Sequence, residues 1–370
     1  MEHQRIAVEY GLKHNKWLLA DEQGLGKSKV AIDIAVKLNK RCLIVCCVNT
    51  LKKNWEKEIR KHSNKTSSIY PQTDGFFIIV NIEKLRNEET AVQLSKLCRD
   101  WIVVVDEIHK VKSPRSKQGQ GLLSLQPEYK LALTGTPVTD SPLDLYVTLK
   151  WLDCEPRCYS QFRSRYCIIG GYNEIIGYKH LDELKSRLQR IMLRRLKRDV
   201  LELPDKTYIN WYVEGHEQGR TITELRQSTA AVKLEELKKI AYNSIVFASY
   251  VKTAEAIHSQ IGGYLITGNT KDRQKYIDAF QCDNKNIVGT YGALGHGVTL
   301  TAADSVIFIE EPWNISDKKQ AEDRAHRIGQ VKPLKIYTLM VKDSIDEYIH
   351  NLLENKGKVT EKLLQDYANG

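Results

Sequence analysis

The chain has 370 residues, 42% of them hydrophobic, with a formal net charge of +10 and a pI of about 9.0. This length allows about two domains of ordinary size, and a mean hydropathy of -0.42 without a long apolar run excludes a membrane-spanning helix. The excess of positive charge favours a polyanionic partner.

The first predicted elements are a strand, a glycine-rich turn and a helix. An apolar run, Trp17–Ala20, precedes the segment Asp21–Ser28, which reads DEQGLGKS, and a helical pattern follows. Glycines let backbone N–H groups converge on an anion, and the helix N-terminus adds partial positive charge. Lys27 is then placed to reach the β- and γ-phosphates of a nucleoside triphosphate, and Ser28 to hold Mg²⁺. Because the strict spacing has a glycine where Asp21 stands, a turn that only caps a helix is the alternative.

Short apolar strands alternate with amphipathic helical stretches in two series. The clearest strands are Cys42–Val48, Phe76–Val80, Trp101–Val105 and Lys130–Leu133, then Ser244–Phe247, Ile287–Val288 and Ser305–Ile309. Such strands indicate parallel sheets covered on both faces. We therefore predict an α/β fold of two tandem lobes, residues 1–205 and 241–370, the second ending in a helix. The connection, residues 206–240, holds an extended piece, Tyr208–Val213, and a charged helical stretch, Thr223–Lys239.

A strongly basic segment, Lys185–Arg198, lies near the end of the first series. Its arginines recur at helical spacing, at positions Arg187, Arg190, Arg194 and Arg198. A solvated helix face and a face that touches phosphates or the opposite lobe fit this pattern about equally well.

The predicted strand Trp101–Val105 ends in two adjacent carboxylates, Asp106 and Glu107. Ligand sites of α/β proteins form at the carboxyl edge of the sheet, and Mg²⁺ takes oxygen ligands. We expect Asp106 to hold Mg²⁺, directly or through water, and Glu107 to polarise the attacking water. Taken alone, such a pair is at least as often structural. Together with the phosphate-binding turn it is the minimum for hydrolysis of a γ-phosphate.

The segment Gln320–Gln330 carries Arg324 and Arg327, three residues apart on a predicted helix. Phosphoryl transfer needs cationic charge on the migrating group. Arginines supplied from the second lobe would couple lobe closure to chemistry. A surface helix with Glu/Arg pairs is the alternative interpretation.

In this order, the motifs resemble the Swi/Snf family of ATPases within helicase superfamily two, over nearly the whole chain. The segments Asp21–Ser28, Asp106–His109 and Leu133–Pro137 resemble the family's phosphate cradle, its Asp-Glu-x-His box and its coupling motif. Gln320–Gln330 matches the arginine motif almost letter for letter. Further matches are the run Leu193–Lys197 with Leu203-Pro204 before the inter-lobe region, the opening of the second lobe at Ile245–Ser249, and Gly295–Thr301 with Trp313-Asn314 facing nucleic acid.

The resemblance implies two RecA-like lobes, with ATP and Mg²⁺ as cofactors. The catalytic residues it implies are Lys27, Asp106, Glu107, Arg324 and Arg327. Those that bind ATP are Gln4, which reads adenine, Gly24, Gly26, Lys27, Ser28 and Gly295, while Ser28 and Asp106 hold Mg²⁺. Coupling falls to Thr134, Gly135 and Thr136.

Members of this family typically track along double-stranded DNA without separating its strands. The resemblance therefore implies a DNA translocase that remodels protein–DNA or DNA structures through contacts to the DNA backbone, which carry no sequence information. Candidate contacts are Lys52, Lys53, Asn54, His296, Thr299, Trp313 and Asn314. Trp313 fits a packed aromatic side chain equally well.

Two other functions stay open. A strand-separating helicase on RNA or DNA uses the same fold, and an ATP-gated DNA clamp or scaffold would bind without hydrolysis. A zinc-dependent module lacks ligands, because Cys154, Cys158 and Cys167 have no Cys-x-x-Cys or Cys/His partner. The scattered cysteines and the polar N-terminus lead us to expect an intracellular protein of the cytoplasm or nucleoid, or of the nucleus in a eukaryote. A recruiting partner protein also stays open.

Overall fold

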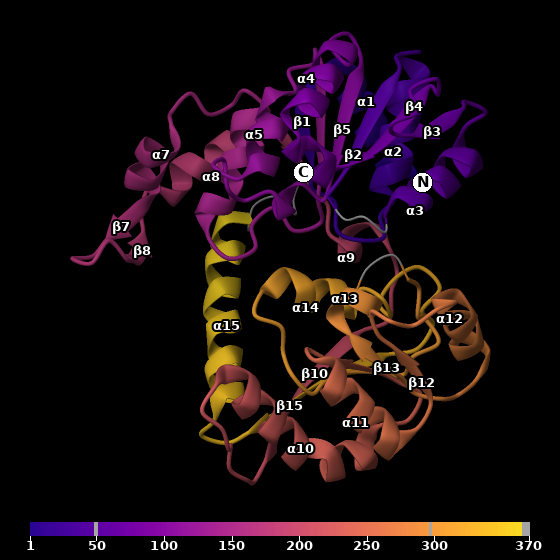
Figure 1. Cartoon of the computed structure of the whole chain (residues 1–370), viewed down its shortest axis with the longest axis vertical. Coiled ribbons are helices and arrows are strands. Elements are labelled where there is room, and N and C mark those ends of the chain that lie inside the picture. The colour runs from indigo at the N-terminus through magenta and orange to yellow at the C-terminus, as the bar shows by residue number, and fades with distance from the viewer. Residues whose placement is uncertain (48–50, 296–297, 365–370) are drawn as a thin grey trace. The chain divides into compact units, whose positions relative to one another are not determined.

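The computed structural model describes residues 1–47, 51–295 and 298–364, and the chain divides into two compact units (Figure 1). The first unit comprises Met1–Val200 and the end of the chain from Val359, and the second comprises Leu201–Lys358. The last residue of the predicted strand Cys42–Val48 lies outside the described residues, as does His296.

A parallel sheet of seven strands, in the order β3-β4-β2-β5-β6-β1-β9, forms the first unit. Its strands are β1 (Lys16–Leu19), β2 (Cys42–Cys46), β3 (Ser67–Ile69), β4 (Phe77–Asn81), β5 (Ile102–Asp106), β6 (Tyr129–Leu133) and β9 (Met192–Leu193). Because β5, β6 and β1 are neighbours, the segments that follow them meet at one carboxyl edge of the sheet.

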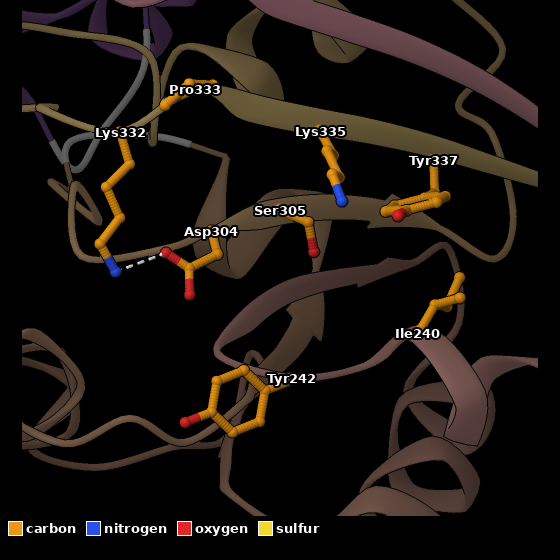
Figure 2. A pocket seen from close by; sticks show the side chains of 8 residues that line it. All are labelled: Ile240, Tyr242, Asp304, Ser305, Lys332, Pro333, Lys335 and Tyr337. Atoms are coloured by element: carbon orange, nitrogen blue, oxygen red, sulfur yellow. Dashed lines mark hydrogen bonds and ion pairs between the residues drawn. The ribbon is translucent and has the colours of Figure 1, made fainter.

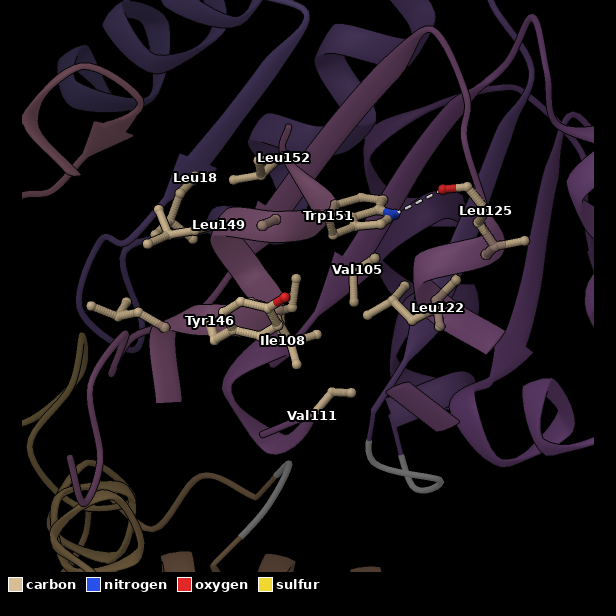
Figure 3. Close-up of a cluster of buried hydrophobic side chains, with 14 of the residues drawn as sticks. Leu18, Val105, Ile108, Val111, Leu122, Leu125, Tyr146, Leu149, Trp151 and Leu152 are labelled. Carbon is tan, nitrogen blue, oxygen red and sulfur yellow. Dashed lines mark hydrogen bonds between the residues drawn. The ribbon is translucent and has the colours of Figure 1, made fainter. Parts of the chain in front are cut away.

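Helices cover both faces of this sheet. Successive residues of β2 alternate between two hydrophobic clusters, with Leu43 in one and Ile44 in the other. The cluster that contains Ile44 is completed by α1 (Glu2–Lys13), α2 (Lys27–Lys37) and α3 (Leu51–His62), and the cluster that contains Leu43 is completed by α4 (Glu88–Leu97), α5 (Lys117–Ser124), α6 (Leu145–Trp151), α7 (Tyr159–Tyr166) and α8 (Leu181–Gln189). Figure 3 shows Trp151 in the second cluster, where its Nε1 donates a hydrogen bond of 3.0 Å to the Leu125 carbonyl. The indole is therefore buried with its one polar group satisfied.

The second unit repeats this plan with six parallel strands, in the order β10-β15-β14-β11-β13-β12. They are β10 (Lys206–Val213), β11 (Ser244–Ala248), β12 (Tyr264–Ile266), β13 (Ile287–Thr290), β14 (Ser305–Phe308) and β15 (Leu334–Val341). One face is covered by α10 (Ile222–Ile240) and α11 (Val251–Ile261), and the other by α12 (Arg273–Cys282), α13 (Tyr291–Leu294) and α14 (Ile315–Glu322). The two parallel sheets, each buried on both faces, confirm the predicted fold class.

The segment 206–240, expected to join the lobes, supplies β10 and α10 to the second unit instead. The reason is that β10 pairs in parallel with β15 along its whole length, from Lys206 opposite Leu334 to Val213 opposite Val341. The end of the last helix, α15 (Ile345–Leu364), belongs to the first unit, where Leu363 is buried. The second unit therefore begins earlier than predicted and ends before the chain does.

The basic segment Lys185–Arg198 is not the single helix that its arginine spacing predicts. Helix α8 ends at Gln189, and β9 and the short α9 (Lys197–Val200) follow. Strand β9 joins the sheet because the N–H groups of Leu18 and Ala20 donate to the carbonyls of Ile191 and Leu193, at 2.7 and 2.8 Å. Pairing with β1 thus prevails over helical periodicity at this edge.

The remaining elements of the described residues are short. Short 3₁₀-helices are η1 (Ile82–Arg86), η2 (Ile108–Lys110) and η3 (Pro142–Asp144), and a hairpin is formed by β7 (Cys167–Ile169) and β8 (Ile175–Tyr178). Within the ranges that the structure describes, no helix has the length and apolar character needed to cross a bilayer.

Candidate nucleotide site

The phosphate loop, Asp21–Ser28, leaves its backbone open to an anion. Gly24 and Gly26 have φ angles of +87° and +85°, which other residues rarely adopt. Gly26 is also the N-cap of α2, so the amino end of an 11-residue helix follows directly. A Cβ at Gly26 would lie 2.2 Å from Nε2 of Gln4. The loop conformation therefore requires glycine here, and a larger residue would also displace the end of the Gln4 side chain.

The side chain of Lys27 is held against its own loop. It is 8% exposed, and its Nζ donates hydrogen bonds to the carbonyls of Asp21 at 2.7 Å and Glu22 at 3.2 Å. Ser28, the next residue of α2, is partly exposed. The loop thus carries a lysine and a serine at successive positions, the two residues that bind phosphate and Mg²⁺ in such loops.

Asp106 lies buried at the carboxyl end of β5. Its Oδ2 accepts a hydrogen bond of 2.9 Å from Nε1 of Trp55 on α3. Burial, followed by the charge of Glu107, raises the pKa of Asp106, although Trp55 and the charge of Lys27 act in the opposite direction. A buried carboxylate with a raised pKa gains most from a cation placed beside it, so Asp106 fits the role of a Mg²⁺ ligand.

Glu107 is buried beside Asp106, but its surroundings shift its pKa in the opposite direction. Its Oε1 accepts a hydrogen bond of 2.7 Å from Nε2 of Gln23, and its Oε2 lies 3.2 Å from Nδ1 of His109. Burial raises its pKa, but the hydrogen bond and charge of His109, with Lys27 and Gln23, outweigh burial and lower the pKa below its ordinary value. Glu107 is therefore ionised at neutral pH and able to accept a proton.

The predicted coupling residues follow β6, between the other two strand ends. Oγ1 of the buried Thr134 lies 2.7 Å from Nδ1 of His109 and accepts a hydrogen bond of 3.0 Å from the N–H of Thr136. A Cβ at Gly135 would lie 3.0 Å from Cγ of Gln23. The coupling motif therefore contacts the acidic pair through His109 and the phosphate loop through Gln23.

Sequence reasoning gave no role to Gln23 or to the Trp55 indole. Nothing in the loop spacing marks Gln23, because any residue fits that position of the pattern. His109 carried a signal in the Asp-Glu-x-His box, but only the structure shows that it contacts both Glu107 and Thr134. These three side chains position the acidic pair.

In the second unit, Arg324 and Arg327 meet at one backbone carbonyl. Nη1 of each donates to the oxygen of Val298 at 3.3 Å. The prediction that both lie on a helix is wrong, because α14 ends at Glu322. The N–H of Arg324 donates a hydrogen bond of 3.2 Å to the carbonyl of Ala321, three residues earlier. Such a bond tightens the end of the helix into a turn. The two guanidinium groups are nevertheless neighbours.

The other predicted residues of the second unit are placed as follows. Gly295 ends α13, and a Cβ there would lie 2.3 Å from the Tyr291 carbonyl oxygen. Thr299 is exposed, and Trp313 is 37% exposed with the Arg226 guanidinium 5.5 Å from its ring centroid. Asn314 caps α14 by accepting a hydrogen bond of 2.8 Å from the Asp317 N–H. Its side chain thus already has a structural role.

The predicted DNA contacts of the first unit lie in the first turn of α3. Lys53 is exposed, and Lys52 and Asn54 are partly exposed. Trp55, the next residue of α3, is buried and reaches Asp106. One helix turn therefore places polar groups at the surface and a tryptophan in the site.

A separate pocket of about 410 Å³ lies in the second unit, at the amino ends of β14 and β15 (Figure 2). One side is closed by an ion pair of 2.8 Å between Lys332 and Asp304. It is lined by Ile240, Tyr242, Asp304, Ser305, Lys332, Pro333, Lys335 and Tyr337. None of the predicted site residues lines it, and the amino edge is the opposite edge from the one at which α/β sheets bind ligands.

Asp106→Asn is expected to stabilise the protein without Mg²⁺ at pH 8, raising the thermal midpoint of the first unit by roughly 2–4 °C. The pKa of Asp106 in the folded protein is raised above the ordinary carboxyl value. Below about pH 4 the carboxyl is protonated in both the folded and the unfolded chain and costs no stability. As the pH rises from there through the folded pKa, the free energy of unfolding falls. Calorimetry in chelator between pH 4 and 8 measures this. Glu107→Gln is the matched control and should not stabilise, since the pKa of Glu107 is lowered. A midpoint for Asp106→Asn at or below that of the wild type would contradict the assignment.

Comparison with known proteins places these motifs in one family. A family profile described as the SNF2-related domain matches residues 3–256, and one described as the helicase conserved C-terminal domain matches residues 228–329. The chain is 28% identical to the SWI/SNF-related matrix-associated actin-dependent regulator of chromatin subfamily A-like protein 1 of Drosophila melanogaster, over 94% of this chain and 53% of that protein. It is 27% identical to the DNA annealing helicase and endonuclease ZRANB3 of Bos taurus, over 96% of this chain and 40% of that protein.

An uncharacterized ATP-dependent helicase of Mycoplasma pneumoniae is 28% identical over 99% of this chain and 42% of that protein. The chain thus spans about half, or less, of the length of these curated relatives. Among solved structures, the Sulfolobus solfataricus SWI2/SNF2 ATPase core in complex with dsDNA aligns with a TM-score of 0.50 at 22% identity, over 98% of this chain and 92% of that chain. At this identity the match concerns the fold, and it agrees with two RecA-like lobes.

Proposed function

Because this chain belongs to the SNF2-related family, we propose that it is an ATPase that uses ATP hydrolysis to move along double-stranded DNA and remodel protein–DNA or DNA structures. The observation that carries the proposal is the cluster at the carboxyl edge of the first sheet. There the phosphate loop that carries Lys27 is hydrogen-bonded to Glu107 through Nε2 of Gln23 at 2.7 Å, and the charge of Lys27 acts to lower the pKa of both Asp106 and Glu107.

We assign the following roles at this edge. Backbone N–H groups at Gly24 and Gly26 and the ammonium of Lys27 bind the phosphates. Ser28 and Asp106 hold Mg²⁺, which when bound neutralises charge on the phosphates. Glu107 orients the attacking water and accepts its proton.

Two further assignments concern the rest of the nucleotide. Gln4 reads the adenine; its amide donates a hydrogen bond of 3.1 Å to the Leu25 carbonyl, so it already lies against the loop. Arg324 and Arg327, with Gly295 on the same unit, act on the charge of the transferred phosphoryl group. Their shared contact with the Val298 carbonyl supports a joint role.

The proposed DNA contacts are to the phosphate backbone and carry no sequence preference. The net charge of +10 supports a polyanionic partner. The proposed contacts are Lys52, Lys53, Asn54, His296, Thr299, Trp313 and Asn314, while Thr134, Gly135 and Thr136 couple them to the acidic pair. Asn314 is the weakest member of this set, because its side chain caps α14.

The testing experiment measures ATP turnover without nucleic acid and then with single-stranded DNA, duplex DNA and RNA, with Glu107→Gln as the blank. We expect duplex DNA to stimulate turnover most. Two of the relatives are named helicases, and stimulation chiefly by single strands or RNA would favour a strand-separating helicase. Absence of turnover under every condition would favour an ATP-gated scaffold.

DNA affinity is expected to fall steeply with salt, by roughly 10-fold or more between about 50 and 200 mM, because each neutralised phosphate releases counterions. Fluorescence anisotropy with a labelled duplex of mixed sequence measures this. A second duplex of unrelated sequence is the control and should bind equally well. An affinity that does not change with salt would contradict the backbone-contact proposal.

A further inference from the structure

The run Leu193–Lys197 has no role in the chemistry proposed above, yet it contacts the phosphate loop at its first residue. The guanidinium of Arg195 pairs with both carboxylate oxygens of Asp21, with its Nε 3.0 Å from Oδ1. The backbone N–H of Arg195 donates to the same Oδ1 at 3.0 Å. The two residues are only 7% and 1% exposed, and a buried charge that loses its partner is strongly destabilised. The pair therefore fixes the start of the loop.

The neighbours of Arg195 extend this attachment on both sides. The N–H of Glu22 donates to the Arg195 carbonyl at 3.1 Å, and the N–H of Lys197 donates to Oε2 of Glu22 at 2.7 Å. Nη1 of Arg194 donates to the carbonyls of Ala20 at 3.1 Å and Gly135 at 3.3 Å. We call the segment Arg194–Lys197 the latch. It contacts the end of β1, the loop and the coupling motif.

Arg195 also reaches the opposite side of the loop. Its Nη1 donates to the carbonyl of His3 on α1. The ring Nε2 of His3 lies 3.0 Å from the Leu25 carbonyl, to which Gln4 also donates. One guanidinium thus braces the first residue of the loop directly and its fifth residue through α1.

This bracing bears on Lys27. The two carbonyls that receive its ammonium group belong to Asp21 and Glu22, and these are the residues that Arg195 and Lys197 hold. The latch also ends close to the boundary of the unit, since Val200 is the last residue before the second unit begins at Leu201. The loop and the chain leading into the second unit are therefore bonded to each other.

We propose that Arg195 is a positioning residue that, through its buried ion pair with Asp21, holds the phosphate loop in its nucleotide-binding shape and joins the loop to residues 194–200. The proposal rests on nucleotide binding as proposed above, and not on DNA. It implies that nucleotide binding is sensed by residues 194–200 through the loop. A lysine cannot replace Arg195, because only the planar fork pairs with both carboxylate oxygens.

The first test measures the dissociation constant of Mg²⁺-ADP by calorimetric titration for the wild type, Arg195→Lys and Arg187→Lys. Arg187 is the matched control, because it lies 3.0 Å from the buried carboxylate of Glu155 in the same unit, away from the loop. We expect Arg195→Lys to weaken ADP binding by about 10-fold to 10²-fold, since a misplacement of binding groups by about 1 Å can have an effect of this size. Arg187→Lys should bind as the wild type does at a comparable thermal midpoint.

The second test follows hydrogen exchange of residues 194–200 in the wild type, with and without Mg²⁺-ADP. We expect added protection on ADP binding, and its loss in Asp21→Asn, which keeps the side-chain size but removes the charge. Wild-type protein that binds no ADP would refute the nucleotide site itself. Wild-type protein that binds ADP, with unchanged affinity in Arg195→Lys or unchanged exchange at residues 194–200, would refute the latch alone.

Discussion

Glu107→Gln is expected to slow ATP turnover by about 10³-fold while ATP still binds, because an amide cannot accept the proton of the attacking water. In the folded protein His109 and Gln23 hold the Glu107 carboxylate, with contacts of 3.2 and 2.7 Å, and together with Lys27 they keep its pKa low. Single-turnover hydrolysis of Mg²⁺-ATP, with binding measured separately, distinguishes the chemical step from affinity.

The control for this prediction is Gln23→Ala, which removes the hydrogen bond to Oε1 and leaves the carboxylate in place. Removal of a group that only positions the base should lower the rate of ATP turnover by roughly 10-fold or less. If Glu107→Gln hydrolysed ATP at the wild-type rate, the general base would lie elsewhere. If Glu107→Gln lost ATP binding as well, the residue would be needed to assemble the site and not only for the chemical step.

The strands that carry the site were predictable from short runs of sequence. The residues of β5 are wholly buried, and a strand buried on both faces reads as a continuous apolar run. Asp106 is the last residue of this strand and Glu107 follows it, so the rule that ligands bind at carboxyl edges located them. The phosphate loop after β1 was located by its glycines and its Lys-Ser end, and Thr134 after β6 by its resemblance to the family's coupling motif.

Pairings between distant segments were not predictable in this way. The extended character of β10 was read correctly from Tyr208–Val213, but its parallel pairing with β15 depends on a segment far along the chain. The ion pair between Asp21 and Arg195 joins residues 174 positions apart, and no local pattern encodes such a contact. Helical spacing of the arginines in Lys185–Arg198 was misleading for the same reason, since β9 is fixed by β1.

Lys27→Ala is expected to weaken binding of Mg²⁺-ATP by about 10²-fold, because hydrogen bonds from an ammonium group to phosphate are charge-assisted and each contributes about 1.5–3 kcal/mol. The measurement is a titration with a fluorescent ATP analogue at fixed ionic strength. The control is Lys29→Ala on the same helix, whose ammonium pairs with Asp33 one turn further along α2. That variant removes the same charge from α2 and should bind as the wild type does.

The Lys27 variant is expected to fold, which makes its loss of affinity interpretable. The carbonyls of Asp21 and Glu22 that receive the ammonium group belong to residues also held by Arg195 and Lys197, so the loop keeps its attachments without the lysine. The charge of Lys27 lowers the pKa of both buried carboxyls, and its removal should therefore cost stability mainly as the pH rises toward neutrality. A variant that binds ATP as tightly as Lys29→Ala would show that Lys27 does not contact the phosphates.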